Sequence, residues 1–352
     1  MRDRIGFIAV GQAGGNIGQL FEIQGFPVLY LNTSMEDLST LKGKHIYHIE
    51  NGEGANKDRD KAKNLVIADY DNIAKRIDDV LPKAELIYVI FAAGGGTGSG
   101  AGPMLIDLIL GDKDISVGAV TILPALNESI KAQMNAYECI RELGDIDGIS
   151  SCFFLDNQTP GKDVCTDSSY KFAVNEQFAS DFIKGIEAPG KYISSKGNVD
   201  TAELFETLKC GGAAIVYALN TFNLADITNY SKHGYIIMPG TKGIKRALFI
   251  APEKASLDEL YKTIGEPLDE YRGYSQDEVF LMLAGMSFPT ERLDKIYELV
   301  KDKKDTIMSA NQTQRCEFKD FDFLSPAPAS NKRKDDMKPQ SRNDILKKYL
   351  KK

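Results

Sequence analysis

The chain has 352 residues, of which 43% are hydrophobic and 26% charged, and its formal net charge is −7. This composition is ordinary for a globular protein, and the length allows two packed domains. No apolar run approaches the ~20 residues that span a bilayer. The N-terminus also reaches glycine too early for a signal peptide, so we expect a cytoplasmic protein.

The five cysteines and three histidines predict neither a disulfide framework nor a metal centre. The cysteines are odd in number and scattered, and no two are spaced as CxxC. The histidines form no HExxH pattern. His45 and His48 belong to a short strand-like segment, where we expect them to face solvent.

The first half of the chain alternates short apolar runs with helical patterns. This alternation is typical of βαβ units and of a mainly parallel sheet. Strands are predicted at Ile5–Val10, Pro27–Leu31, Leu86–Phe91, Ser116–Leu123 and Ser151–Leu155. Glycine or asparagine follows nearly every one of them. Since open α/β sheets bind ligands at the carboxyl ends of their strands, we expect the ligand crevice there.

A long helix and a second α/β section follow. The helix is predicted from about Asp167 to Ile186 and should end at Pro189-Gly190. The second section has predicted strands at Ala213–Ala218, Tyr235–Met238, Arg246–Ile250 and Val279–Ala284, and predicted helices at Ala255–Ile264 and Pro289–Lys304. We therefore expect a nucleotide-binding domain (1–166), a central helix and linker (167–196), a second, smaller α/β domain (197–324) and a flexible tail (325–352).

The strongest local feature is the segment Gly94-Gly95-Gly96-Thr97-Gly98-Ser99-Gly100, between a predicted strand and a predicted helix. Glycine lets the backbone approach an anion closely, so that several N–H groups can converge on it. The positive end of the following helix adds to the attraction. The arrangement indicates a polyphosphate ligand.

A second glycine-rich loop is predicted at Gly11–Gly18, with the sequence GQAGGNIG. It lacks the G-x-G-x-x-G spacing of dinucleotide enzymes and the final Gly-Lys-Ser/Thr of a Walker A loop. We expect phosphate binding through backbone amides, without a lysine in the loop.

Together these two loops resemble the tubulin/FtsZ superfamily. GGGTGSG matches the family signature, and GQAGGNIG is similar to the first loop of tubulin. Further segments also resemble family loops: Asn32-Thr33-Ser34, Gly52-Glu53-Gly54-Ala55-Asn56, and the Pro-x-x-x-Glu pair Pro124 and Glu128. The resemblance implies the tubulin/FtsZ-like fold, with a Rossmann-like GTPase domain. It also implies GTP or GDP with Mg²⁺ as the ligand, and head-to-tail filaments.

The resemblance also implies roles for single residues. Asn157 and Asn175 would recognise guanine, since an amide offers both a donor and an acceptor, and Phe172 or Tyr170 would stack on the base. Asp200 and Glu203, supported by Asn198, would enter the pocket of the next subunit and position the attacking water; read locally, Asp200 caps a helix over Thr201–Leu208. The implied nucleotide contacts are Gly11, Gln12, Ala13, Gly14, Asn16, Asn32, Gly54, Ala55, Asn56, Gly94, Gly95, Gly96, Thr97, Gly98, Pro124, Glu128, Asn157, Phe172 and Asn175.

Within the superfamily, the C-terminal stretch of the chain favours the TubZ group, whose filaments segregate plasmid or phage DNA. Residues 331–352 hold nine basic and three acidic residues, and no FtsZ-type terminal peptide is found. The resemblance implies a DNA-bound adaptor of the TubR type as the partner of this tail, and a cationic segment also attracts DNA phosphate. A solubilising tail is the alternative.

Three other functions are weighed against this one. An FtsZ-like cell-division ring GTPase is the nearest. A structural filament without hydrolysis follows if Glu203 does not replace the aspartate of the family. An NAD-dependent oxidoreductase would need an acidic residue where Asn32-Thr33-Ser34 stands.

Overall fold

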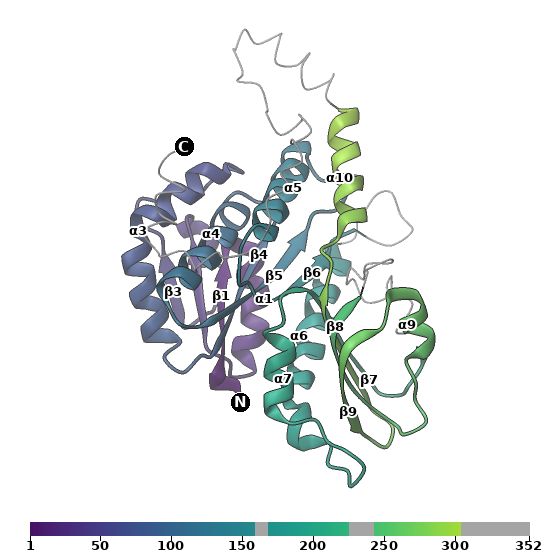
Figure 1. Cartoon of the computed structure of the whole chain (residues 1–352). Helices are drawn as coiled ribbons and strands as arrows, with labels where there is room; N and C mark the ends of the chain where they lie inside the picture. Colours follow the sequence, from purple (N-terminus) through teal and green to yellow (C-terminus); the bar gives the residue numbers. More distant parts are fainter. Residues whose placement is uncertain (159–167, 225–242, 304–352) are drawn as a thin grey trace, which may run out of the picture.

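One sheet forms the centre of the molecule in the computed structural model, which describes residues 1–158, 168–224 and 243–303 (Figure 1). Ten described strands follow the order β3-β2-β1-β4-β5-β6-β7-β10-β8-β9. Their bounds are β1 Ile5–Val10, β2 Val28–Asn32, β3 His45–His48, β4 Leu86–Ala92, β5 Ser116–Leu123, β6 Ser151–Asp156, β7 Gly212–Leu219, β8 Ile244–Ala251, β9 Pro267–Tyr274 and β10 Val279–Met286.

Along this order, each pair of adjacent strands from β3 through β7 is parallel. Strand β10 then pairs antiparallel with both β7 and β8. The second α/β section therefore continues the sheet of the first through the β6–β7 pair. The predicted domain boundaries stay a prediction.

Helices cover the sheet. Their bounds are α1 Gly11–Ile23, α2 Met35–Ser39, α3 Arg59–Val80, α4 Thr97–Asp112, α5 Ile130–Gly144, α6 Ser168–Lys191, α7 Thr201–Leu208, α9 Asp258–Ile264 and α10 Thr290–Asp302. Helix α10 packs beside α5, as Figure 1 shows. None of the helices in the described ranges is long and apolar enough to cross a membrane.

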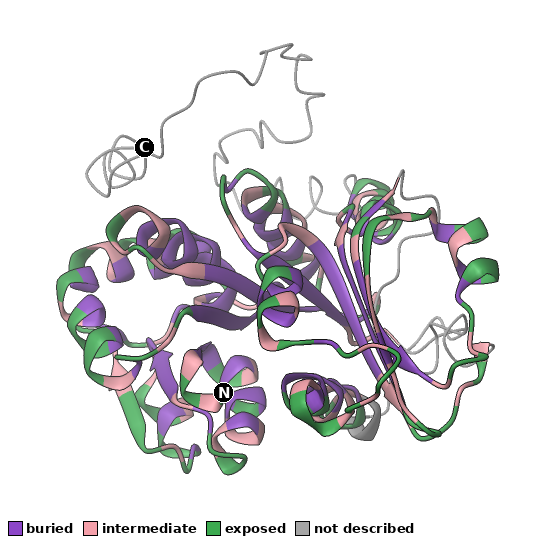
Figure 2. Ribbon diagram, turned by 60° about the horizontal axis from the view of Figure 1, so that its bottom comes forward, coloured by how far each residue is buried: buried purple, intermediate pink, exposed green. Residues whose placement is uncertain are grey.

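The core lies where the sheet meets these helices. Strands β1, β2 and β4 are buried almost throughout, as expected for parallel strands covered on both faces. Figure 2 shows the buried residues along the strands and on the helix faces turned toward them. Phe178 and Phe182 of α6, one turn apart, pack with Phe7, Phe21 and Phe153. This aromatic cluster fixes α6 against the sheet.

Most predicted elements are confirmed to within about three residues. The long helix loses helical geometry at Pro189 and Gly190, as predicted, because Gly190 adopts a φ of 87°. Strand β9 was not predicted, because it is an exposed edge strand with the charged sequence PLDEYRGY and no apolar alternation. The predicted strand Tyr235–Met238 lies outside the described residues.

Candidate functional site

The loops after β1, β2, β4, β5 and β6 lie at one edge of the sheet, because these neighbouring strands run parallel. The crevice at the carboxyl ends of such strands is the usual ligand position. Every candidate contact predicted from Gly11 to Asn157 belongs to one of these loops, to a helix that starts there, or to the 51–58 loop joined to them.

The first turns of α1 and α4 lie side by side within this crevice. A Cβ on Gly11, which has a φ of 72°, would lie only 3.5 Å from the backbone N of Gly98. The first amides of a helix have no partner in their own helix. Two such ends side by side present several N–H donors and two positive dipole ends, which suits a polyphosphate.

The prediction of a loop at Gly11–Gly18 was wrong, because α1 begins at Gly11. Its glycines serve close packing rather than a flexible turn. A Cβ on Gly14 would lie 2.3 Å from the carbonyl oxygen of Ile90, and one on Gly18 would lie 2.8 Å from Cβ of Ala9. The candidate contacts Gln12 and Asn16 occupy the exposed side of the same turns, and Ala13 is half-buried.

The glycines before α4 bring three loops together. A Cβ on Gly94 would lie 3.2 Å from Cβ of Pro124, and one on Gly96 would lie 2.7 Å from the backbone N of Lys57 and 2.9 Å from Cβ of Ala55. Gly95 differs, since the nearest atom to its Cβ would be 3.9 Å away. Gly94 and Gly96 therefore hold the neighbouring loops close, while Gly95 leaves room.

The loop after β2 is joined to α4 and to the 51–58 loop through Thr33. The hydroxyl groups of Thr33 and Thr97 lie 2.7 Å apart, and the Gly54 N–H donates to the Thr33 carbonyl over 2.7 Å. The candidate residue Asn32 is buried and occupied within its own loop: its amide donates to Asp37, and its Oδ1 accepts from the Ser34 N–H. Its position makes Asn32 a residue that shapes the loop.

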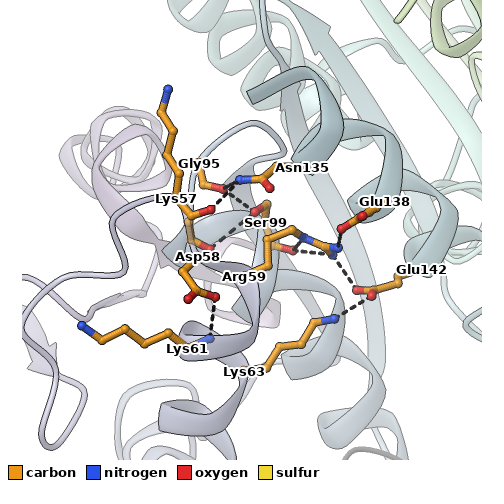
Figure 3. A network of polar contacts seen from close by, with 11 residues as sticks. Lys57, Asp58, Arg59, Lys61, Lys63, Gly95, Ser99, Asn135, Glu138 and Glu142 are labelled. Carbon is orange, nitrogen blue, oxygen red and sulfur yellow. Dashed lines mark hydrogen bonds and ion pairs between the residues drawn. The ribbon is translucent and has the colours of Figure 1, made fainter. Parts of the chain in front are cut away.

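Two buried polar residues that the sequence did not single out brace the glycine loop (Figure 3). Arg59 donates to the carbonyl of Ser99 over 3.1 Å and forms ion pairs with Glu138 and Glu142 of α5. The Nδ2 of Asn135 donates to the carbonyls of Lys57 and Gly95, over 3.0 and 2.9 Å. These bonds anchor the glycine loop through its carbonyl groups.

The charge of Arg59 is maintained by its neighbours. Burial by itself would lower the pKa of its guanidinium, but Cys139, Glu142 and Glu138 raise it above the ordinary value. The fully charged side chain therefore ties α3, α4 and α5 together beneath the glycine loop.

The loop after β5 contacts the first turn of α6 and the end of β6. Oε1 of Glu128 accepts from Lys171 Nζ over 3.0 Å and from the Ala125 N–H over 3.1 Å. The Gln158 side chain accepts from the Leu126 N–H over 2.7 Å. Among the described residues no hydrogen bond engages Oε2 of Glu128, which remains available for a ligand hydroxyl.

The candidate base-binding residues gather beside this loop, where α6 begins. Asn157 follows β6 and is half-buried. Phe172 is 56% exposed. Oδ1 of Asn175, one turn along α6, is buried and has no hydrogen-bond partner in the described structure. A buried polar atom without a partner is costly, so the site fits a ligand that donates a hydrogen bond, as guanine does. The side chain of Tyr170, the alternative stacking residue, is not described.

Arg292 of α10 braces this side of the crevice and was also missed in the sequence. Its guanidinium binds both carboxylate oxygens of Asp156, over 2.9 and 3.2 Å, and donates to the carbonyl of Pro124 over 2.6 Å. The side chain is buried. One arginine therefore holds the ends of β5 and β6 in register, next to Asn157.

The candidate carboxylates lie at the start of α7, with Asp200 as its N-cap and Glu203 in its first turn. Asp200 caps α7 as predicted: its Oδ1 accepts from the Glu203 N–H, and Glu203 Oε2 accepts from the Asp200 N–H, each over 2.9 Å. This is a capping box. One oxygen of each carboxylate takes no part in it. Oδ1 of Asn198 accepts from the Ser194 N–H and closes the preceding turn.

Helix α6 connects the glycine crevice at its first turn to the segment that leads to Asp200 and Glu203, here called the carboxylate segment, at its other end. Lys171 in the first turn of α6 contacts Glu128 at the crevice, whereas Glu187 near its other end pairs with Arg2, just before β1 begins. The helix from Ser168 to Ala188 spans about 30 Å at roughly 1.5 Å per residue. Phe205 of α7 lies against Arg4, just before β1 begins, so the helix that Asp200 caps lies beside the start of β1, whereas the crevice lies beyond its end.

Comparison with known proteins gives concordant matches. Residues 4–160 match the model of the Tubulin/FtsZ family, GTPase domain. The chain is 26% identical over 329 residues to the tubulin-like protein TubZ of a Clostridium botulinum C phage, which covers 86% of this chain and 84% of that protein.

Solved structures with the same fold include relatives from a phage and an archaeon. The crystal structure of Clostridium botulinum phage c-st TubZ superposes with a TM-score of 0.75 at 23% identity, covering 87% of this chain and all of that one. The GTPγS-bound protofilament of CetZ2 from Haloferax volcanii gives 0.67 at 20% identity, covering 86% and 99%. The resemblance inferred from the motifs and the predicted fold class are confirmed.

Proposed function

We propose, from the match of residues 4–160 to the GTPase domain of the tubulin/FtsZ family, that the chain is a GTPase that polymerises head to tail, with each active site completed by the next subunit. The separation of the glycine crevice from Asp200 and Glu203 along α6 carries this proposal. A nucleotide held at one end of a subunit meets those carboxylates only when a second subunit stacks on it. The GTPγS-bound CetZ2 protofilament supports assembly of this kind.

The residues of the crevice divide among the three parts of the nucleotide. The amides of α1 and α4 bind the phosphates, Glu128 accepts from the ribose, and Asn157 and Asn175 read the guanine, on which Phe172 stacks. Mg²⁺ accompanies the phosphates; it retains several water ligands in such sites, so the crevice need not supply a carboxylate cage.

Hydrolysis follows from positioning and charge. Phosphoryl transfer requires a water held in line with the terminal phosphate and compensation for developing charge. Asp200 and Glu203 each have one carboxylate oxygen outside the capping box, and these oxygens orient the water. Asn198 supports them by shaping the turn before Asp200.

The shared site is tested by mixing two inactive variants. Gly96→Ala pushes the loop at Lys57 away from α4 and disables the crevice but leaves the carboxylates intact. Asp200→Asn disables the carboxylate segment but leaves the crevice intact. We expect each variant alone to release little phosphate. In the mixture, turnover should recover at those subunit contacts where the unaltered crevice of Asp200→Asn meets the unaltered carboxylates of Gly96→Ala. Co-sedimentation of both variants without any recovery would contradict the proposal.

We further propose that the filament acts in the cytoplasm in DNA segregation, through a DNA-bound adaptor held by residues 325–352. The excess of basic residues in this stretch and the likeness to TubZ support that role. Truncation after Leu324 should abolish binding to an adaptor–DNA complex, measured by co-sedimentation at low and high salt, while GTP turnover stays near that of the full chain. Loss of both together would contradict the separate role of the tail, and retained binding would show that another part of the chain holds the adaptor.

A further inference from the structure

Two buried arginines brace the crevice, and each belongs to a different helix. Arg59 of α3 holds the glycine loop, as Figure 3 shows, whereas Arg292 of α10 holds the loops after β5 and β6. Arg292 donates to the Pro124 carbonyl over 2.6 Å and forms an ion pair with Asp156 at 2.9 Å. The exposed fractions of the Arg292 and Asp156 side chains are 8% and 16%, so water competes little for these bonds.

The bonds of Arg292 belong to a closed ring of hydrogen bonds. Oδ1 of Asp156 accepts from Arg292 over 3.2 Å and from the Gln158 N–H over 2.9 Å. Oε1 of Gln158 in turn accepts from the Leu126 N–H over 2.7 Å. The ring thereby returns to the loop after β5, two residues beyond Pro124. A rigid planar guanidinium fixes a carbonyl and a carboxylate relative to each other, so Arg292 sets the spacing of the two loops.

The proposed contacts to the base and the ribose are attached to this ring. Asn157 follows Asp156 directly, and its N–H donates to the Leu123 carbonyl over 3.1 Å. Glu128 ends the other loop, where its Oε1 accepts from the Ala125 N–H over 3.1 Å. Neither side chain touches Arg292 through a hydrogen bond in the described structure. A shift of the ring would nevertheless displace both.

The phosphate side of the crevice has a separate brace. Asn135 donates to the Gly95 carbonyl over 2.9 Å, and Arg59 donates to the Ser99 carbonyl over 3.1 Å. The loop after β5 also keeps a second attachment, because Gln133 of α5 donates to its Ala125 carbonyl over 2.6 Å. A change at Arg292 should therefore shift the base and ribose contacts and leave the glycine loop in place.

We propose that Arg292 is a positioning residue that sets how strictly the crevice selects guanine and ribose, without a part in holding the phosphates. The inference rests on the proposed nucleotide-binding function. Arg292 acts through Pro124 and Asp156, so α10 takes part in selecting the nucleotide although it does not contact it. A lysine at this position would keep the positive charge but lose the planar fork, and with it the spacing of the two loops.

The test compares the wild type with Arg292→Lys by titration calorimetry with GDP, IDP and 2′-deoxy-GDP, below the concentration at which filaments scatter light. IDP lacks the 2-amino donor of guanine, and 2′-deoxy-GDP lacks a ribose hydroxyl. We expect the wild type to prefer GDP over both. In the variant, the affinity for GDP should fall about tenfold, as for one lost hydrogen bond. The preference for GDP over each analogue should narrow at least about threefold.

Three further variants separate positioning from stability. Arg292→Met leaves the Asp156 carboxylate without its cation and should narrow the preference further; if it does not fold, Arg292→Lys decides alone. Asn135→Ala loosens the phosphate side and should weaken all three nucleotides equally, with the preference retained. Lys295→Met removes an exposed cation from the same helix and should alter neither affinity nor preference.

Each other outcome is decisive. An equal loss for all three nucleotides in Arg292→Lys would overturn the proposal, because the arginine would then support the phosphates or the fold as a whole. Unchanged affinities would also overturn it, since the guanidinium would then brace only the fold. A wild-type protein that binds none of the nucleotides would contradict the proposed function itself, whereas normal wild-type preferences kept in the variant would contradict only the role of Arg292.

Discussion

Asp200→Asn should lower GTP turnover at least about a hundredfold while fold and assembly are preserved. Losses of this size are typical when one group that stabilises a transition state is removed. Asparagine caps a helix as well as aspartate does, so the bond to the Glu203 N–H and the start of α7 remain. Only the negative charge is removed. Phosphate release is measured alongside thermal unfolding and sedimentation of filaments, so that a loss of hydrolysis is distinguished from a loss of folding or assembly.

Matched variants sharpen this prediction. Glu203→Gln keeps the reciprocal bond of the capping box and should also slow turnover with little change in stability. Asp200→Ala removes the cap as well and should cost about 1 kcal/mol of stability. Near wild-type turnover in Asp200→Asn would mean that the carboxylate only caps α7, and the chain would then be a filament protein whose hydrolysis, if any, uses other groups.

Gly14→Ala should destabilise the protein and abolish nucleotide binding. The added Cβ would lie 2.3 Å from the carbonyl oxygen of Ile90, which belongs to β4 and cannot rotate away. Helix α1 must therefore lift off the sheet, which carries its first turn away from α4. Overpacking of this kind costs about 1–3 kcal/mol or more. Denaturant unfolding and nucleotide titration measure the two consequences.

Gly144→Ala is the control for this effect, because it makes the same chemical change in a helix with room for it. Its Cβ would meet nothing nearer than the Phe288 ring at 3.7 Å. The change should leave nucleotide binding intact and stabilise the protein by up to about 1 kcal/mol. Equal behaviour of the two variants would contradict the packing role assigned to Gly14.

Local patterns were sufficient to predict most strands of the sheet and the edge at which their loops gather. Buried parallel strands are continuous apolar runs, so β1 and β5 were predicted at their observed bounds. The glycines from Gly94 to Gly98 predict a phosphate turn, because few other roles call for such a run between a strand and a helix. The cap at Asp200 was also readable, because an aspartate stands immediately before the predicted helix Thr201–Leu208.

Contacts between distant segments were not readable. Arg59, Asn135 and Arg292 bind residues 40 to 168 positions away, and nothing near them in the sequence indicates those partners. The same limit explains the error at Gly11–Gly18: the glycine pattern of a loop and that of a helix packed tightly on a sheet look alike until the position of β4 is known.

The central claim is that a subunit hydrolyses GTP only against its neighbour. The most direct measurement follows GTP turnover per subunit over a range of protein concentrations, with light scattering recorded in the same cuvette. The account predicts turnover near zero below a threshold, and a rise above it in step with scattering. Turnover per subunit that is constant at all concentrations would mean that one chain holds the whole active site, in contradiction to the arrangement proposed here.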